Sequence, residues 1–391
     1  MTEEIFRRDG YAFEFEAAVI SVEGDDIELD ITAFYPGGGG QVCDTGNIRG
    51  LPVTEVSYKA DRIIHKTPKN DIKAGERVWC SVDWDRRYDL MQGHTGEHLL
   101  FCSLRRQIPE LTISKIFISP ESKYVIVDRD VSWEEIREAL VFANNAIREN
   151  LPVTKSLMSR DDPDIEKVRI KMERIAEDEE ISVVAIGNID LSACSGIHVM
   201  ETGELEMIFV DRKVSAGKDG VAIHFKVGDQ AKDSAMALAN TCLKTIEVTG
   251  SKPEDIVRTV SNTKEELQTM QESVSDHVKR LIDRSSPSVV NGINIHNGLF
   301  PQVDRTILTD AAESFKSKGD ISILISVGDT ASVIMSSGVD SIDCSEILTK
   351  VLKKLGGRGG GKKDFAQGGI PDPTSAEDAL SMLMYEVIPQ L

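Results

Sequence analysis

Three patterns in the sequence predict an α+β protein with four parts. Residues 1–85 contain short runs in which apolar and polar side chains alternate, and this favours a small antiparallel β-barrel or sandwich at the N-terminus. Residues 86–228 alternate helical with strand patterns, which is typical of an α+β domain. Residues 229–284 show only helical periodicity and predict a long arm, and residues 285–391 predict a compact C-terminal α/β domain.

The composition is that of a globular protein. The 391 residues, of which 40% are hydrophobic and 28% charged, are enough for two or three domains. A net charge of −20 argues against indiscriminate binding to nucleic acid, although it leaves room for a local basic site. Six irregularly spaced cysteines do not form a disulfide framework.

Neither a membrane span nor a signal peptide is expected. The longest apolar runs are only a few residues, too short for a transmembrane helix. The first ten residues are charged and lack the apolar segment of a signal peptide. We therefore expect a cytoplasmic protein.

A run of four glycines, Gly37 to Gly40, interrupts the predicted barrel between strands expected at 27–31 and 78–82. Consecutive glycines cost backbone entropy, so they indicate close approach of the chain to another group. A flexible hairpin loop is the alternative interpretation, and the stretch alone does not decide between them.

The second part is predicted to hold helices and short strands in turn. Ser132 and Glu135 form a capping-box pattern that opens one of these helices. The expected elements are a helix at 86–107, strands at 116–118 and 124–127, helices at 132–150 and 161–179, a strand at 181–186, and a closing hairpin at 205–210 and 221–227.

Two pairs of metal-ligating residue types have the same spacing. His94 and His98 lie four apart in the first predicted helix, so both imidazoles project from one face. Cys194 and His198 repeat the spacing further along the chain. Together the pairs supply three nitrogens and one thiolate, a set that suits one tetrahedral Zn²⁺ per chain.

Either pair alone would be a weak signal, but the chain has only seven histidines and six cysteines. The metalloprotease pattern places a glutamate beside the first histidine, whereas Glu97 here precedes the second. A protease is therefore not expected.

The arm is predicted as two helices, at 229–248 and 252–284. The second is about 50 Å long at 1.5 Å per residue. Its apolar side chains form one stripe that serves either to pack on its own domain or as a dimer seam. The stripe comprises Ile256, Val260, Leu267, Met270, Val274, Val278 and Leu281.

The last part begins after a helix-breaking Ser-Ser-Pro-Ser at 285–288 and is expected to contain strands at 321–325 and 331–335 with helices at 308–318, 342–355 and 374–387. Between these elements, residues 353–369 contain five basic residues and seven glycines. Exposed backbone N–H groups flanked by cations suit phosphate, although a solvated basic loop is the alternative and the order of a P-loop is absent. The basic residues are Lys353, Lys354, Arg358, Lys362 and Lys363.

Five landmarks in order resemble the editing domain of alanyl-tRNA synthetase. The resemblance is strongest to the free-standing AlaX-type editing proteins of the long form, and the glycine-rich stretch is similar to the C-terminal domain shared with DHH-type phosphoesterases. The landmarks are Phe34-Tyr35-Pro36 with Gly39-Gly40-Gln41, Asp83-Trp84-Asp85-Arg86-Arg87, His94-Thr95 with His98-Leu99-Leu100, Val183-Val184-Ala185-Ile186-Gly187, and Cys194 to Glu204.

The resemblance implies a zinc hydrolase that removes wrongly attached serine, and often glycine, from tRNA(Ala). Carried over by position, the zinc ligands are His94, His98, Cys194 and His198. It implies that Gly39, Gly40 and Gln41 close over the acylated 3′ end, that Thr112 or Ser114 recognises the seryl hydroxyl, and that the C-terminal domain helps to hold the tRNA. Glu97 is expected to act as a base, or to lie on the surface or behind a ligand.

Two departures from the family pattern affect substrate preference. The family's Cys-Gly-Gly-Thr-His is Cys194-Ser195-Gly196-Ile197-His198 here, and Ser182 replaces an arginine. Two alternatives stay open: a non-catalytic tRNA-binding protein with structural zinc, and editing of another mischarged tRNA such as Ser-tRNA(Thr). A homodimer through the arm or the C-terminal domain is also expected.

Overall fold

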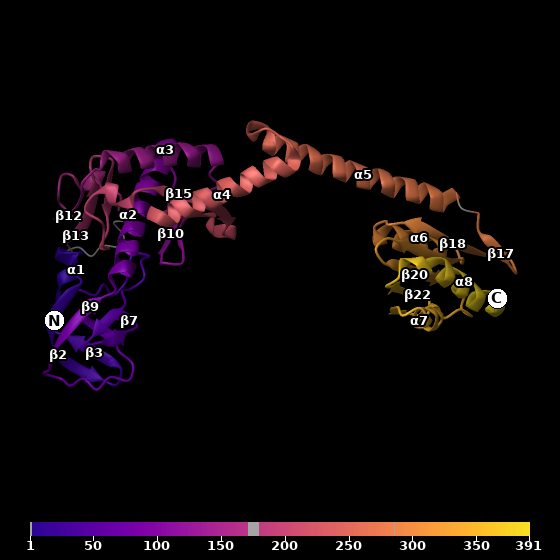
Figure 1. Cartoon of the computed structure of the whole chain (residues 1–391), viewed down its shortest axis with the longest axis horizontal. Coiled ribbons are helices and arrows are strands. Elements are labelled where there is room, and N and C mark those ends of the chain that lie inside the picture. Colours follow the sequence, from indigo (N-terminus) through magenta and orange to yellow (C-terminus); the bar gives the residue numbers. More distant parts are fainter. Residues whose placement is uncertain (1, 171–179, 285) are drawn as a thin grey trace. The chain divides into compact units, whose positions relative to one another are not determined.

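The protein is an α+β molecule of two compact units, residues 1–244 and 245–391. The structure, a computed structural model, describes residues 2–170, 180–284 and 286–391. Eight α-helices and several sheets occur in this described part (Figure 1), which confirms the predicted α+β class. The four-part layout stays a prediction. No helix among the described residues combines the length and apolarity that a membrane crossing requires.

An antiparallel sheet of seven strands begins the first unit and nearly closes into a barrel. Its order is β6-β5-β9-β2-β3-β8-β7. The two outermost strands, β6 and β7, are separated in the sequence only by Thr54, so the sheet must curve round on itself. The strands are β2 (Glu14–Glu23), β3 (Asp26–Leu29), β5 (Gly46–Ile48), β6 (Leu51–Val53), β7 (Glu55–Lys59), β8 (Arg62–Lys66) and β9 (Arg77–Val82).

The rest of this unit is built on helix α2 (Trp84–Gln107), which confirms the helix predicted for the two histidines. It begins directly after β9 and extends from the barrel-like sheet to α3 (Trp133–Glu149) (Figure 1). The predicted capping box at Ser132 and Glu135 opens α3. The surrounding strands are β10 (Ile113–Ile118), β11 (Lys123–Val127), β15 (Ile208–Ser215) and β16 (Val221–Val227) in one sheet, and β12 (Val153–Met158), β13 (Ile181–Ile186) and β14 (Asp190–Ala193) in another.

Two glycines let α2 pack closely against its neighbours. A Cβ on Gly93 would lie 2.6 Å from Cε of Lys123, and one on Gly96 would lie 2.7 Å from a methyl group of Val227. Glycine inside a helix costs roughly 1 kcal/mol relative to alanine. Here that cost accompanies a close approach of α2 to the strands, and a larger residue at either position would require the Lys123 or Val227 side chain to shift.

The described part of one predicted helix of this unit is wrong, and one predicted strand begins later than expected. Residues 161–170 form turns and a short 3₁₀ helix, Ile165–Lys167, instead of an α-helix, because the Asp162 side chain accepts from the Asp164 N–H and Pro163 interrupts the helical pattern. Residues 171–179 of that prediction lie outside the described residues. The strand expected at 205–210 begins only at Ile208, because a 3₁₀ turn, Thr202–Leu205, precedes it.

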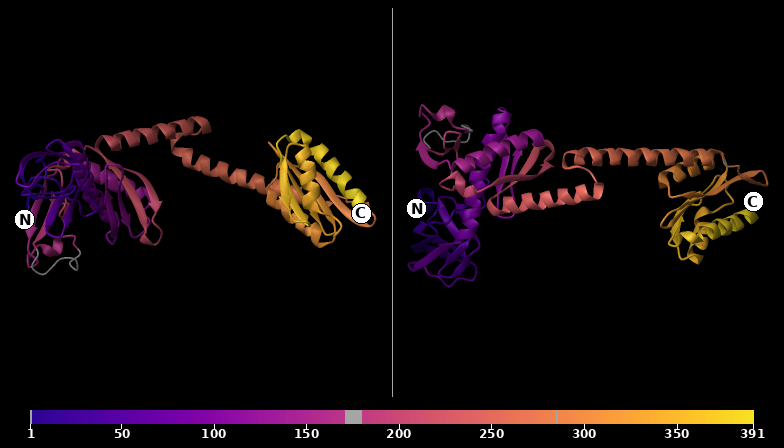
Figure 2. Two further views of the ribbon diagram at one scale, coloured as in Figure 1. Left: turned by 90° about the horizontal axis from the view of Figure 1, so that it is seen from below. Right: turned by 45° about the horizontal axis from the view of Figure 1, so that its top comes forward.

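The second unit contains a six-stranded mixed sheet with helices on both faces. α6 (Arg305–Ser317) packs on one face, and α7 (Cys344–Lys354) and α8 (Ala376–Val387) pack on the other. α8 is the yellow helix beside the sheet in Figure 2. The strands are β17 (Ser288–Val290), β18 (Ile293–Pro301), β19 (Ile321–Val327), β20 (Ala331–Ser337), β21 (Arg358–Gly361) and β22 (Phe365–Ile370).

The glycine-rich basic stretch is a β-hairpin and not a loop. β21 and β22 pair antiparallel at the edge of the sheet, so part of their backbone N–H groups is used in the ladder. Glycine is required because a Cβ on Gly359 or Gly368 would lie 2.8 or 2.3 Å from Cδ1 of Leu352 in α7. The glycines therefore let a hairpin lie directly on a helix.

The two helices predicted for residues 229–284 are confirmed, namely α4 (Gly228–Thr249) and α5 (Ile256–Arg284). Of the predicted apolar stripe only Val278 is buried, and together with Ile282 it packs in the α6 core. Of the two interpretations of the stripe, packing on its own domain therefore explains only the residues near the C-terminal end of α5. The exposed members of the stripe are Val260, Leu267, Met270, Val274 and Leu281.

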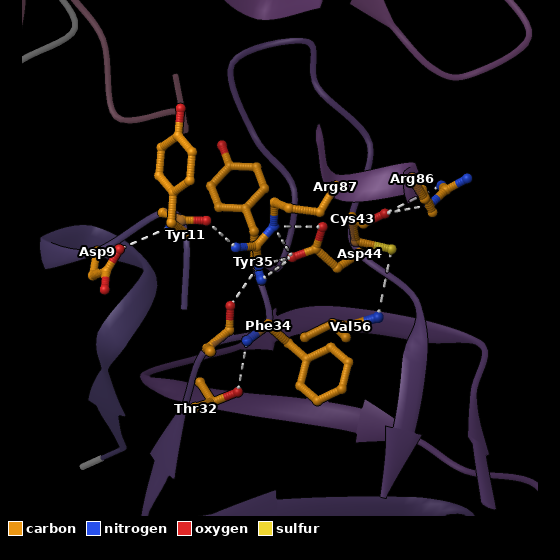
Figure 3. A network of polar contacts seen from close by, with 12 residues as sticks. Asp9, Tyr11, Thr32, Phe34, Tyr35, Cys43, Asp44, Val56, Arg86 and Arg87 are labelled. Atoms are coloured by element: carbon orange, nitrogen blue, oxygen red, sulfur yellow. Dashed lines mark hydrogen bonds and ion pairs between the residues drawn. The ribbon is translucent and has the colours of Figure 1, made fainter. Parts of the chain in front are cut away.

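A buried ion pair connects α2 to the barrel (Figure 3). The Arg87 side chain is fully buried, and its Nε lies 3.1 and 3.0 Å from the two carboxylate oxygens of Asp44. The same guanidinium donates to the carbonyl oxygens of Gly10 at 2.8 Å and Ala33 at 2.5 Å. Asp44 also accepts from the Tyr35 N–H at 2.6 Å, so both charges are fully hydrogen-bonded.

Replacing one member of this pair should destabilise the first unit strongly. We expect Asp44→Asn to cost about 3–5 kcal/mol, because it leaves the Arg87 charge buried and uncompensated. All three tryptophans, Trp79, Trp84 and Trp133, lie in this unit, so urea unfolding followed by tryptophan fluorescence reports on it.

The matched control is Glu16→Gln, which removes an exposed ion pair with Arg77 at 3.3 Å and should cost less than about 1 kcal/mol. Equal unfolding midpoints for the two variants would contradict this account of Arg87.

Candidate metal centre

The two predicted ligand pairs come together between α2 and the loop that follows β14. α2 presents His94 and His98, and the loop presents Cys194 and His198. The four candidate ligand atoms all lie within 4.8 Å of one another. Sγ of Cys194 is 3.3 Å from Nε2 of both His94 and His198.

Each histidine of this cluster is held by a hydrogen bond on its outer nitrogen. A hydrogen bond at Nδ1 fixes the ring and leaves Nε2 for a metal, which is the usual arrangement of histidine ligands. The bonds join Nδ1 of His94 to Oε1 of Gln41 (2.7 Å), Nδ1 of His98 to Oδ2 of Asp190 (3.2 Å), and Nδ1 of His198 to Oγ1 of Thr95 (3.1 Å).

The ligand loop fits against α2 because of one glycine and one threonine. A Cβ on Gly196 would lie 2.1 Å from Cε1 of His94, so no other residue fits at this position. Oγ1 of Thr95 also accepts from the Val199 N–H at 3.2 Å. The loop is therefore attached to the same turn of α2 that carries the first ligand.

The charge states of Cys194 and His198 suit a metal, whereas that of His98 does not. Burial raises the pKa of the Cys194 thiol, but His94 and His198 outweigh it and lower that pKa well below its usual value. Burial lowers the pKa of His198 to about 3. Burial also lowers the pKa of His98, but hydrogen bonds with Asp190 and Cys194 raise it to about 10, so a metal has to displace a proton there.

A thiolate and three imidazole nitrogens are the donors that Zn²⁺ prefers. The buried carboxyl group of Glu97 lies beside them, with neither oxygen hydrogen-bonded to a described residue. The residues present therefore fit a divalent cation.

Three residues of the cluster, His94, His98 and Cys194, line a cavity of about 780 Å³. Five residues predicted for the substrate or for catalysis also line it, namely Gly39, Gly40, Glu97, Thr112 and Ser114. Gln41 is buried, and its side chain contacts His94 instead of lining the cavity. Glu97 is buried as well, so a surface role for it is wrong.

The four-glycine run is held in place against β10, which favours close approach over a flexible loop. A Cβ on Gly40 would lie 2.5 Å from the Ile116 carbonyl oxygen. The Ile118 N–H donates to the Gly40 oxygen at 2.8 Å, and the Val42 N–H donates to the Ile118 oxygen at 3.1 Å. Gly37 to Gly40 all have positive φ, which larger residues rarely adopt.

The two candidates for recognising a seryl hydroxyl differ in their surroundings. Oγ of Ser114 donates to the backbone oxygens of Ile126 at 3.2 Å and Asp219 at 3.3 Å, so its hydrogen is already engaged. Thr112 is exposed at the cavity. Which of the two acts stays a prediction.

Sequence reasoning missed the residues behind the ligands. Asp190 accepts from Oγ of Ser192 at 2.7 Å and from Nη2 of Arg169 at 3.3 Å, and the Arg169 guanidinium lies 4.9 Å from the ring of Phe101. Neither Asp190 nor Arg169 belongs to a local sequence pattern that would have marked it as a partner of the ligands. The predicted basic residues, Lys353, Lys354, Arg358, Lys362 and Lys363, belong to the second unit, at the end of α7 and in the hairpin.

Removing the hydrogen bond behind His94 should weaken metal binding. We expect Gln41→Ala to lower zinc affinity about 10–100-fold, because the ring loses the group that fixes its orientation. Competition with a chromophoric chelator measures this. Gln268→Ala, an exposed glutamine on α5, should leave the affinity unchanged; equal affinities for both variants would exclude this role of Gln41.

Comparison with known proteins shows that the chain is similar in sequence to proteins that act on alanyl-tRNA. Residues 292–387 match the DHHA1 domain family. The chain is 28% identical to an alanine–tRNA ligase of Methanoregula boonei over 97% of its own length and 42% of the ligase, and so spans about two fifths of that relative. It is 26% identical to the alanyl-tRNA editing protein AlaX-L of Pyrococcus horikoshii over 95% of each chain.

Among solved structures, this chain is 28% identical to the C-Ala domain of Aquifex aeolicus alanyl-tRNA synthetase. The match covers 27% of this chain and 98% of the C-Ala domain, with a TM-score of 0.24. The relatives confirm the resemblance to AlaX-type editing proteins that carry a C-terminal domain.

Proposed function

We propose that the chain is a trans-editing hydrolase that deacylates mischarged Ser-tRNA(Ala) and Gly-tRNA(Ala) by zinc-dependent ester hydrolysis. One observation carries this proposal: the four candidate ligands converge, and three of them, His94, His98 and Cys194, line a cavity that the Gly39-Gly40 loop also lines. The likeness to AlaX-L over nearly the whole of both chains supports it.

The need for such an activity follows from the limits of selective binding. A synthetase site shaped for alanine cannot strongly exclude the smaller glycine, and its rejection of serine is incomplete. A second site that hydrolyses the wrong ester corrects both errors.

The chain's own residues would hold the metal, admit the ester and exclude water. His94, His98, Cys194 and His198 would hold one Zn²⁺, which supplies activation of water and polarisation of a carbonyl when bound. Four protein ligands close a tetrahedral site, so hydrolysis needs a released ligand, a fifth position or a metal that only orients the substrate.

Two groups of residues would contact the substrate near this centre. Gly39 and Gly40 have no side chains, so the acylated 3′ end can approach the ligands closely. Thr112 or Ser114 would donate to or accept from the seryl hydroxyl. Phe101 and Leu111 supply apolar wall that excludes bulk water.

The second unit would bind the body of the tRNA. In a chain of net charge −20, five basic residues gathered in and beside one edge hairpin favour phosphate contacts. These residues are Lys353, Lys354, Arg358, Lys362 and Lys363. The exposed apolar stripe of α5 would support a homodimer.

A panel of four substrates separates this proposal from its alternatives. We expect hydrolysis of Ser-tRNA(Ala) and Gly-tRNA(Ala), little hydrolysis of Ala-tRNA(Ala) or Ser-tRNA(Thr), and loss of activity after chelation that added zinc restores. Hydrolysis of Ser-tRNA(Thr) instead would indicate the other editing reaction. Binding of tRNA without any hydrolysis would indicate a non-catalytic protein with structural zinc.

Loss of the thiolate ligand should abolish the reaction. We expect Cys194→Ala to reduce bound zinc, measured by atomic emission, and to slow deacylation by more than about 100-fold, since even supporting residues cost 10–100-fold. Cys242→Ala is the matched control, because this thiol is exposed on α4. Full activity of Cys194→Ala would show that Cys194 is not part of the site.

A further inference from the structure

Two carboxylates lie directly beside the ligand cluster, and their surroundings differ. Asp190 is hydrogen-bonded by His98 at 3.2 Å, Ser192 at 2.7 Å and Arg169 at 3.3 Å. Its charge is therefore compensated by a guanidinium and two further groups of the chain.

Glu97 has no comparable partners. Its side chain is fully buried, and neither carboxylate oxygen accepts a hydrogen bond from any residue that the structure describes. Oε2 lies 3.8 Å from Nε2 of His98, the ring nitrogen left for a metal. Among the described side chains, Glu97 alone has both carboxylate oxygens buried and without a hydrogen bond.

The position of Glu97 on α2 explains why it lies here. It follows His94 by three residues and precedes His98 directly, and side chains three apart lie on the same side of a helix. The helix that presents the two imidazoles therefore also places the Glu97 carboxylate beside them.

A buried carboxylate without donors is strongly unfavourable unless a cation compensates it. The ligand set supplies one negative charge, from Cys194, while the histidines ligate as neutral imidazoles. A divalent cation held by these four residues would leave one buried positive charge. Asp190 cannot balance it, because its own charge is already matched by Arg169.

We propose that Glu97 is a positioning residue whose charge balances the metal centre and sets how tightly a divalent cation is held. Glu97 borders the cavity, but both of its carboxylate oxygens are buried, which argues against a role in moving protons at the substrate. The inference rests on the metal centre of the proposed function but not on any particular substrate.

The test compares the full-length chain with Glu97→Gln, which keeps the shape and removes the charge. Zinc affinity is measured by competition with a chromophoric chelator, and thermal unfolding with and without zinc. We expect Glu97→Gln to bind zinc about 10–100-fold more weakly, the range found for groups that support metal ligands. Its unfolding midpoint without metal should not fall below that of the original chain, and the rise on adding zinc should be smaller.

Two further variants keep the test specific. Glu97→Asp retains the charge and should recover part of the lost affinity. Glu110→Gln removes an exposed carboxylate from the lining of the same cavity, so it should leave zinc affinity unchanged.

The outcomes separate this inference from the proposed function. If the original chain binds no zinc, the metal centre itself is wrong. If it binds zinc and Glu97→Gln binds equally well, only the role of Glu97 is overturned. If Glu97→Gln lowers the midpoint equally with and without zinc, Glu97 stabilises the fold alone and the inference also fails.

Discussion

The attachment of the Cys194 loop to α2 is the contact on which the candidate site depends. The two ligand pairs lie about a hundred residues apart in the sequence, and their atoms meet within a few ångströms only if this loop packs on the helix. Gly196 permits the approach and Thr95 holds both His198 and the Val199 N–H. Any metal bound here would therefore also stabilise the fold of the first unit.

The barrel contributes to the same site through one short segment. Gln41 contacts His94, and Asp44, three residues later, contacts Arg87. His94 and Arg87 are seven residues apart, which is two helical turns, so both project from the same side of α2. The segment from 41 to 44 therefore contacts the helix at two points. One of them is the fully buried ion pair of Asp44 and Arg87 (Figure 3).

Local patterns predicted the parts of the site that depend on spacing. The four-residue spacing of His94 and His98 on one helix needed no knowledge of the fold, and the capping box at Ser132 was equally local. Residues that act through tertiary contacts gave no such signal. Asp190, Thr95 and Arg169 became visible only when strands and loops distant in sequence were brought beside the ligands.

The incorrect predictions have related causes. The stretch from 353 to 369 was interpreted as a phosphate site between secondary-structure elements, with a solvated basic loop as the alternative. Its glycines are needed where a hairpin lies on Leu352. Charged residues at 161–170 suggested a helix, yet local hydrogen bonds of Asp162 favour turns. In both cases a contact of one side chain outweighed the average preference of the segment.

The central claim is that one metal ion is held by three imidazoles and one thiolate from two distant segments. X-ray absorption spectroscopy at the zinc edge of the purified protein tests it most directly. The account predicts one zinc per chain with one sulfur at about 2.3 Å and three nitrogens at about 2.0–2.1 Å. A spectrum without a sulfur ligand, or with only oxygen and nitrogen in six-fold coordination, would contradict it.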